Sequence, residues 1–261
     1  MSLPLVTLTT DFGSNDPYVA AMKGIIYAGC PVATVADLSH EIPRQNVHEA
    51  ALFAGGALPY FRAGTVHVIV VDPGVGTARR PLAVYAGHRY FICPDNGVLT
   101  LVLQHFALEE ARVIENPRFM RTPVSTTFHG RDIFAPAAAL LAAGVDFHEV
   151  GPPAANLVTL DMPAPVLRGG SIEGAVVHVD HFGNCITNIH VDSLEGRMNG
   201  CVMAGNLAIE RILRTYGDVL QGTPLALISS TGHLEIAISG GSAAQELGIG
   251  IGDVVRVAGG E

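Results

Sequence analysis

The fold is predicted most directly from residues 65–74, TVHVIVVDPG. The run Thr65–Val71 is apolar and mostly β-branched around one histidine, which indicates a buried β-strand. The strand is expected to stop at Asp72-Pro73-Gly74, because proline and glycine favour a turn. A buried strand needs other elements to cover it, so the flanking sequence should supply further strands and helices.

Strand-like and helix-like segments alternate on both sides of this run, as they do in α/β proteins. Such alternation favours a parallel or mixed sheet that is covered on both faces. We therefore expect residues 1–160 to form an α/β domain with a central, mostly parallel sheet between helices. The other expected strands are residues 5–9, 33–38, 82–86 and 90–93, and the expected helices are residues 17–28, 47–58, 97–105 and 133–143.

The second half of the chain changes character after residues 151–170. This segment holds four prolines and three glycines, so it is the best linker candidate. The apolar runs beyond it are short and rich in β-branched residues, and turn signals such as Gly240-Gly241 separate them. The pattern predicts a small all-β C-terminal domain, an antiparallel barrel or sandwich, over residues 170–261.

Composition argues against several classes of protein. Of the 261 residues, 49% are apolar, which is enough to form a hydrophobic core. The net charge of −9 disfavours binding to nucleic acid or to an anionic membrane. No apolar run reaches the roughly 18–20 residues that a membrane span needs. The start, MSLPLVTLTTDFG, lacks the features of a signal peptide, and the four cysteines match no zinc spacing. A cytoplasmic protein without a bound metal is expected.

The first loop that could carry chemistry is Thr9-Thr10-Asp11-Phe12-Gly13. An acid at the C-terminal end of a strand lies where open α/β sheets bind their ligands. The Asp11 carboxylate could accept hydrogen bonds from both hydroxyls of a ribose. The alternative is a simple helix start, because Asp16 and Pro17 open the next helix.

A second loop runs from Asp72 through Val75 to Arg79. If it folds back, the planar guanidinium of Arg79 can hold the Asp72 carboxylate in one orientation. Its glycines resemble a phosphate-binding loop only weakly, since a third glycine and a following helix are missing. The alternative is a purely structural salt bridge.

A third loop places His129 beside Gly130 and in front of an apolar helix. Histidine titrates near neutral pH and is the commonest acid or base in catalysis, so His129 is a catalytic candidate. Asp132 could simply cap the helix. A metal site built from Asp11, Asp72, His129 and Asp132 is a further hypothesis, although these spacings match no metal-binding signature.

The fourth loop, Asp180-His181-Phe182-Gly183-Asn184, lies in the β-rich half and is followed by Thr187 and Asn188. It is more polar than a hairpin turn requires, so it could bind an amino-acid zwitterion. The alternative is a turn that is stabilised by its own Asp and Asn side chains.

These four segments, in this order and in a two-domain setting, resemble the S-adenosylmethionine hydroxide adenosyltransferase family over essentially the whole chain. The most specific match joins Asp72-Pro73-Gly74-Val75-Gly76-Thr77 and Arg79 to Phe128-His129-Gly130-Arg131-Asp132. The resemblance implies hydrolysis of S-adenosylmethionine to adenosine and methionine. Water would attack the 5′ carbon, with neither a metal nor another cofactor.

The resemblance also implies roles for single residues. Asp72, Arg79 and His129 would form the catalytic triad that handles the water. Related halogenases lack this triad and carry an additional loop in the first domain, whereas the segment from Arg80 to Pro94 is short here. Asp11 would hold the ribose, Asp180 would meet the methionine ammonium group, and the full set of expected substrate-binding residues is Asp11, Phe12, Val75, Phe128, Asp180, Asn184, Asn188 and Ser230.

Finally, the resemblance implies a homotrimer in which the first domain of one subunit and the β-domain of its neighbour enclose the substrate. Three other functions stay open at this point. A halogenase would form a chlorinated nucleoside, and a non-catalytic sensor of S-adenosylmethionine or adenosine would bind without turnover. A metal-dependent hydrolase of another nucleoside or phosphate would lose activity in chelator.

Overall fold

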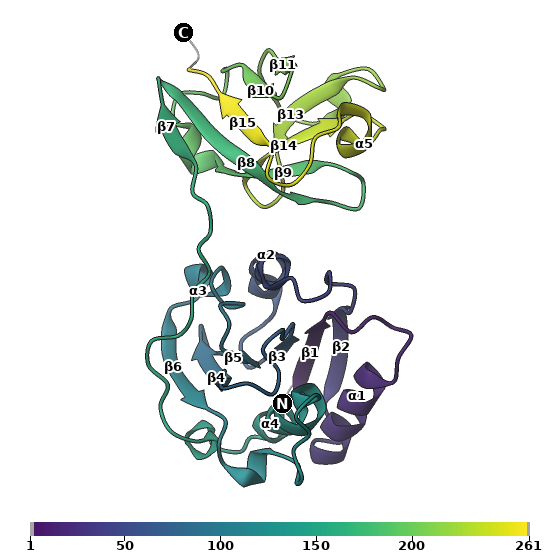
Figure 1. Cartoon of the computed structure of the whole chain (residues 1–261), viewed down its shortest axis with the longest axis vertical. Coiled ribbons are helices and arrows are strands. Elements are labelled where there is room, and N and C mark those ends of the chain that lie inside the picture. The colour runs from purple at the N-terminus through teal and green to yellow at the C-terminus, as the bar shows by residue number, and fades with distance from the viewer. Residues whose placement is uncertain (1–2, 260–261) are drawn as a thin grey trace. The chain divides into compact units, whose positions relative to one another are not determined.

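The computed structural model describes residues 3–259, which divide into two compact units on either side of the link between Leu160 and Asp161 (Figure 1). The first unit is an α/β unit and the second is a β-rich unit with a nearly barrel-like sheet. This confirms the expected order of an α/β unit followed by a β-rich unit. None of the helices in the described part of the chain is long and apolar enough to cross a bilayer.

The first unit is built on a six-stranded mixed sheet with the strand order β2-β1-β3-β5-β4-β6. The pairs β1–β2, β1–β3 and β3–β5 are parallel, whereas β4 runs antiparallel to both β5 and β6. The strands are β1 (Leu5–Thr10), β2 (Thr34–Ser39), β3 (Val66–Val70), β4 (Pro81–Ala86), β5 (Arg89–Pro94) and β6 (Leu108–Val113).

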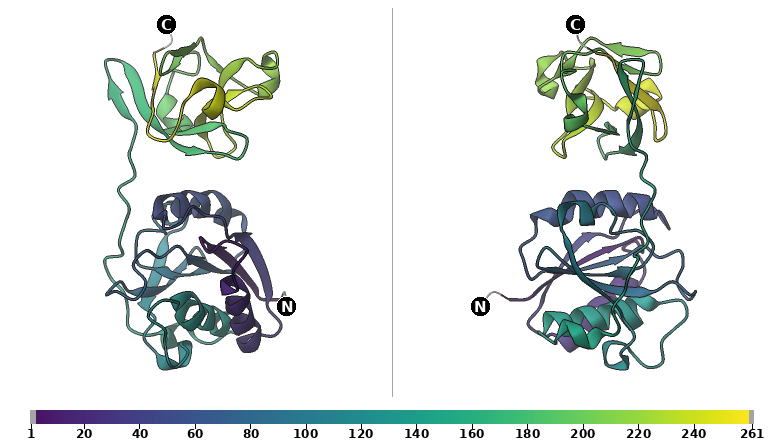
Figure 2. Two further views of the ribbon diagram at one scale, coloured as in Figure 1. Left: turned by 45° about the vertical axis from the view of Figure 1, so that its right-hand side comes forward. Right: turned by 90° about the vertical axis from the view of Figure 1, so that its left-hand side faces the viewer.

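Helices cover both faces of this sheet, as Figure 2 shows. Helices α1 (Tyr18–Gly29) and α4 (Ala135–Ala142) lie on one face, and α2 (Val47–Ala57) and α3 (Val102–His105) lie on the other. The central strand β3 serves both layers, because Val68 packs into the α1/α4 core while Ile69 packs into the α2/α3 core. Burial on both faces explains the unbroken apolar run from which the strand was predicted.

The structure departs from the expected elements of this unit in two places. Residues 97–105 were expected to be helical throughout, but only Val102–His105 are. Gly97 takes a φ of 90°, outside the helical range, and residues 98–101 form turns, one of them closed by the Thr100 amide on the Gly97 carbonyl. Strand β6 was not predicted. It lies at the sheet edge and its sequence, LEEARV, exposes its first residues, so it lacks the apolar run that marks a buried strand.

The second unit is a nine-stranded sheet in which neighbours are antiparallel except for the pair β12–β13. Strand β7 lies inside the segment that was predicted to be a linker. Its three residues are exposed and follow Pro165, so they show no pattern that predicts a strand. The strands are β7 (Val166–Arg168), β8 (Ser171–Val179), β9 (Cys185–His190), β10 (Val202–Ala204), β11 (Leu207–Ile209), β12 (Ile212–Leu213), β13 (Pro224–Ile228), β14 (His233–Ile238) and β15 (Val254–Val257), and helix α5 spans Ala243–Leu247.

One ionisable side chain lies in the middle of the first unit. His67 of β3 is fully buried, stacks on Phe91 at 5.1 Å between ring centroids, and places Nδ1 2.7 Å from the Thr7 hydroxyl oxygen. Burial, together with the nearby charge of Arg89, lowers the pKa of His67 to about 3. The native protein therefore keeps this ring uncharged across the physiological range.

His67 should make the protein less stable in mild acid. The unfolded chain binds a proton at this ring below about pH 6.5, whereas the native state does not until about pH 3, so stability falls as the pH drops through that window. Between pH 7 and pH 5 we expect a loss of about 2 kcal/mol in the free energy of unfolding. Urea titrations at both pH values measure it. His67→Asn should remove most of this loss, and Ile69→Val, a neighbouring core change without a titrating group, should retain it. An unchanged loss in His67→Asn would contradict the assignment.

Candidate active site

The candidate site lies at the carboxyl edge of the parallel strands. Asp11 follows β1 directly, and Asp72 follows β3 after Val71. Because β1 and β3 are parallel neighbours, with Thr10 opposite Val70, their following loops leave the sheet side by side. This edge is where open α/β sheets bind ligands.

The loop after β3 folds back so that Arg79 reaches Asp72. Two backbone hydrogen bonds make the turn, from Val75 N to the Asp72 oxygen at 3.2 Å and from Thr77 N to the Gly74 oxygen at 3.1 Å. Arg79 Nε then donates to both Asp72 oxygens at 3.0 Å, and Nη2 donates to Oδ2. The two side chains are only 9% and 5% exposed, so the pair is desolvated and fixed in orientation.

His129 completes this group from a distant part of the chain. Arg79 Nη2 lies 2.6 Å from His129 Nδ1. Because a guanidinium only donates hydrogen bonds, Nδ1 must accept, and the proton of the neutral imidazole therefore lies on Nε2. Burial and the charge of Arg79 both lower the pKa of His129, which favours this neutral form.

The loop that carries His129 is held by a buried carboxylate. Asp132 is 0% exposed and accepts hydrogen bonds from the Arg121 and Arg131 guanidinium groups and from the Ser125 amide. These bonds, led by the one from Arg131, lower the pKa of Asp132 to about 2 against the opposing effect of burial. Asp132 lies within the π-helical turn Gly130–Phe134 that precedes α4, so it anchors the loop rather than serving as a simple helix cap.

A glycine lets the two loops touch. Gly76 has a φ of 76°, and a Cβ at this position would lie 2.3 Å from the Thr126 carbonyl oxygen. Only a residue without a side chain permits that approach. The contact fixes the Asp72–Arg79 loop against the loop that ends in His129.

Aromatic rings line the region next to His129. Phe12 and Phe128 meet edge to face with centroids 5.9 Å apart, and Tyr18 lies 5.2 Å from Phe128 and 5.7 Å from Phe12. The Arg131 guanidinium lies 5.0 Å from the Phe128 ring centroid. The structure thus brings the expected Phe12 and Phe128 together and adds Tyr18, which was not among the expected site residues.

Asp11 and Val75 lie in these same loops. Asp11 Oδ2 accepts a hydrogen bond from the Gln45 amide at 2.7 Å, and Val75 is half-buried in the turn after Asp72. Within the first unit, the expected residues therefore fall on three loops: one after β1, one after β3 and one before α4.

The expected residues of the second unit are engaged mainly in local contacts. Asp180 accepts hydrogen bonds from the Phe182 and Asn184 amides and from Asn184 Nδ2, which is the self-stabilised turn considered as an alternative. In the side-chain amide of Asn188, Oδ1 accepts a hydrogen bond from Ala175 N and Nδ2 donates one to the Pro163 carbonyl oxygen. Ser230 is exposed in the turn between β13 and β14.

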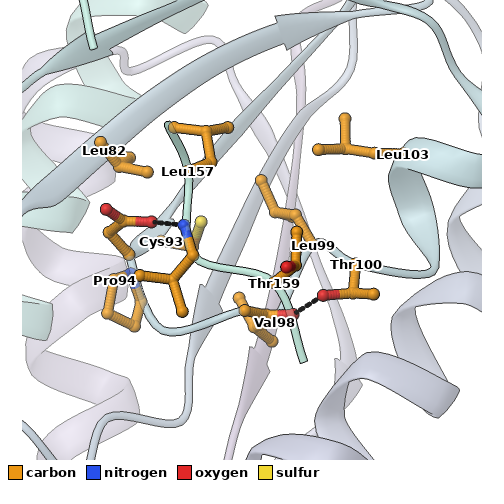
Figure 3. A pocket seen from close by; sticks show the side chains of 12 residues that line it. Leu82, Cys93, Pro94, Val98, Leu99, Thr100, Leu103, Leu157 and Thr159 are labelled. Carbon is orange, nitrogen blue, oxygen red and sulfur yellow. Dashed lines mark hydrogen bonds between the residues drawn. The ribbon is translucent and has the colours of Figure 1, made fainter. Parts of the chain in front are cut away.

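A cavity of about 20 Å³ lies elsewhere in the first unit, between the end of β5 and the segment that follows residue 156 (Figure 3). It is lined mainly by apolar side chains, among them Leu82, Cys93 and Leu157. It holds about one water molecule, and its lining contains none of the expected site residues. It is not a substrate pocket.

The hypothesis of a metal site finds no support in the geometry. Asp72 and His129 are both bonded to Arg79, so a cation already lies between them. Asp132 is taken up by two arginines. Among residues 3–259, no group of three or more His, Cys, Asp or Glu side chains is placed to hold a metal ion.

Comparisons with known proteins identify the family that the chain resembles over nearly its whole length. Residues 6–151 match the SAM hydroxide adenosyltransferase N-terminal domain, and residues 174–256 match the C-terminal domain of the same family. A Thermus thermophilus protein named (R)-S-adenosyl-L-methionine hydrolase is 39% identical over 97% of this chain and 98% of its own length. A fluorinase from an Actinoplanes species is 29% identical over 90% of each chain. A crystal structure of an uncharacterized conserved protein from Thermotoga maritima superposes with a TM-score of 0.90 at 36% identity, covering 97% of this chain and 99% of that one.

Gly76→Ala should destabilise the protein more than an ordinary glycine substitution. The added methyl group meets the Thr126 carbonyl, and we expect a loss of about 2–4 kcal/mol in the free energy of unfolding, from backbone strain plus overpacking. Gly64→Ala is the matched control, since Gly64 has a similar φ of 79° with no atom within 4 Å of an added Cβ. Chemical denaturation of both variants measures the difference. Equal losses would show that the two loops do not pack as described.

The His129 ring should titrate below its ordinary range. Protonation would place a second positive charge beside Arg79 and would break the bond that Nδ1 accepts, so the neutral form persists in mild acid. We expect the ring-proton NMR titration to give a pKa below 6.5 in the native protein and a higher pKa in Arg79→Gln. A native midpoint at or above 6.5 would contradict the contact between Arg79 and His129.

Proposed function

The chain belongs to the SAM hydroxide adenosyltransferase family, and we propose that Asp72, Arg79 and His129 carry out its reaction. The protein hydrolyses S-adenosylmethionine to adenosine and methionine, the activity after which its 39%-identical relative is named. The observation that carries the assignment of these residues is the continuous contact from Asp72 through Arg79 to His129 in a desolvated loop.

The chemistry needs little beyond a well-placed water. Water attacks the 5′ carbon of the substrate while the bond from that carbon to sulfur breaks, and methionine leaves as a neutral thioether. The leaving group needs no proton, so the catalytic task is to orient the water and to remove one proton from it. Orientation alone can lower such a barrier by roughly 7–11 kcal/mol in favourable cases.

The tautomer of His129 points to a division of roles. With Nδ1 accepting from Arg79, neutral His129 presents Nε2–H and can donate a hydrogen bond to the water oxygen. Asp72 is then the member of the group with basic lone pairs to take the proton. Arg79 keeps both partners in place and stabilises the carboxylate.

The remaining expected residues have roles that we propose from the same loops. Asp11 binds the ribose hydroxyls, and Phe12, Val75 and Phe128 keep the reacting centre dry as the sulfonium charge disappears. In the second unit, Asp180, Asn184 and Ser230 are the candidates to bind the amino-acid and adenine ends of the substrate. Asn188 has a structural use instead, because both ends of its amide are bonded within its own unit.

We also propose that the protein is a cytoplasmic homotrimer. In support, Phe182 is 74% exposed in the loop that carries Asp180 and Asn184, which leaves its ring available to pack against a neighbouring subunit. The buried, unpaired Cys30, Cys93 and Cys185 fit a reducing compartment. Sedimentation analysis of wild type and Phe182→Ser tests the assembly.

Product analysis tests the reaction itself. The protein is incubated with S-adenosylmethionine in chloride buffer, with and without chelator, and the sulfonium epimers are supplied separately because the named relatives act on the R epimer. We expect adenosine and methionine, a preference for the R epimer and no effect of chelator. A 5′-chlorinated nucleoside would assign the chain to the halogenases, and binding without any product would make it a sensor.

Two substitutions separate the roles of Asp72 and His129. Asp72→Asn should lower kcat by about 10²–10⁴ with little change in KM, since it removes the base. His129→Gln should retain activity within about tenfold, because glutamine keeps a donor near the Nε2 position, whereas His129→Ala should lose far more. Steady-state kinetics measure all three. If His129→Gln is as inactive as His129→Ala while Asp72→Asn turns over, the histidine is the base.

A further inference from the structure

A chain of four polar side chains reaches the loop after β1 from the side of β2. Lys23 Nζ donates to Asp37 Oδ2 at 2.5 Å, and Asp37 Oδ1 lies 3.0 Å from His40 Nε2. His40 Nδ1 lies 2.9 Å from Thr10 Oγ1. We call Lys23, Asp37, His40 and Thr10 the His40 chain. It makes none of the contacts that hold Asp72, Arg79 and His129 together.

The His40 chain ends on the backbone next to Asp11. Thr10 is the fully buried last residue of β1, and its Oγ1 accepts a hydrogen bond from the Phe12 amide at 3.2 Å. The carbonyl of His40 accepts a second bond from the Gly13 amide at 2.7 Å. His40 therefore holds the Gly13 amide directly through its main-chain carbonyl and the Phe12 amide indirectly through Thr10, both just beyond Asp11.

The hydrogen bonds of this chain are consistent with a single direction. Lys23 only donates and ionised Asp37 only accepts, so Asp37 favours a proton on His40 Nε2. Nδ1 is then an acceptor for the Thr10 hydroxyl, whose oxygen accepts from the Phe12 amide. Asp37 Oδ1 and His40 Nε2 lie close to each other, although without the linear geometry of a strong hydrogen bond. Although burial alone would raise the pKa of Asp37, its interactions with Lys23 and His40 hold that pKa below the ordinary value.

The same segment also holds the carboxylate of Asp11. The main-chain N–H of Gln45 donates a hydrogen bond to Asp11 Oδ2 at 2.7 Å. Gln45 has a φ of 62°, a left-handed conformation that non-glycine residues rarely adopt. Backbone strain of this kind persists where the surrounding structure requires it. Residues 40–45 thus hold the Asp11 carboxylate and the Gly13 amide directly, and the Phe12 amide through Thr10.

We propose that His40 is a positioning residue for the ribose of the substrate. It fixes the segment from Asp11 to Gly13 so that the Asp11 carboxylate meets the 2′ and 3′ hydroxyls in one orientation. This inference rests on the proposed function, in which Asp11 binds the ribose. A purely structural role, in which His40 only joins β1 to β2, makes different predictions.

The test compares two substrates in the His40→Ala variant. With S-adenosylmethionine, kcat/KM should fall on the order of ten- to a hundredfold, mainly through KM, because the ribose contact is misplaced. With the 2′,3′-dideoxy analogue, which offers Asp11 no hydroxyl, wild type and variant should be nearly equal. A merely structural role would lower kcat/KM for both substrates by the same factor, and that result would overturn the proposal.

Further variants keep the test decisive. Thr10→Val removes only the hydroxyl that His40 meets, so it should repeat the effect if His40→Ala does not fold. Combining His40→Ala with Asp11→Ala should cost little beyond Asp11→Ala alone, since residues that act through one contact are not additive. His105→Ala, an exposed histidine on α3, is the control and should leave both substrates unaffected. Additive losses in the double variant would contradict a role through Asp11.

A binding measurement separates this inference from the proposed reaction. Calorimetry with adenosine and 2′,3′-dideoxyadenosine needs no turnover. If wild type forms no product but binds adenosine, the proposed function fails, while the selective loss of adenosine affinity in His40→Ala still supports the inference. Equal losses for both nucleosides would overturn it, and if wild type binds neither, both proposals fail.

Discussion

A guanidinium group that is removed from water must be neutralised and hydrogen-bonded, and at Arg79 this requirement organises the site. Asp72 meets it with a carboxylate that is only 5% exposed. The same pairing directs Nη2 at His129, which fixes the tautomer of the ring, and the charge of Arg79 adds to burial in lowering the pKa of His129. One ion pair thus sets the orientation of the carboxylate and the protonation state of the histidine.

The rest of the first unit keeps that ion pair at the edge of the sheet where we propose that the reaction takes place. Parallel pairing of β1 and β3 brings the Asp11 and Asp72 loops to one edge of the sheet. Asp132, fully buried between two arginines, anchors the loop of His129. The approach of Gly76 to Thr126 then sets the spacing between these loops. Rigid loops of this kind suit a reaction in which the main task is to orient one water molecule.

The sequence made some of this predictable. The apolar run at Thr65–Val71 predicted β3, and the return of Arg79 to Asp72 could be proposed because a short turn joins them. The partners of Asp132 could not be predicted in the same way, since Arg121 lies eleven residues away and the bond depends on the folded loop. Likewise, the contact of His40 with Thr10 spans thirty residues and exists only because β1 and β2 pair in parallel. The edge strands β6 and β7 were not predicted, because exposed strands lack the apolar pattern of a buried strand.

The central claim is that this arrangement delivers water to the 5′ carbon of S-adenosylmethionine. The most direct measurement is mass spectrometry of the products formed in water enriched in ¹⁸O. The account predicts one ¹⁸O atom in the adenosine, at the 5′ oxygen, and none in the methionine. Adenosine without the label, or label in the methionine, would show that the new bond does not form between water and the 5′ carbon, and would contradict the mechanism built on Asp72, Arg79 and His129.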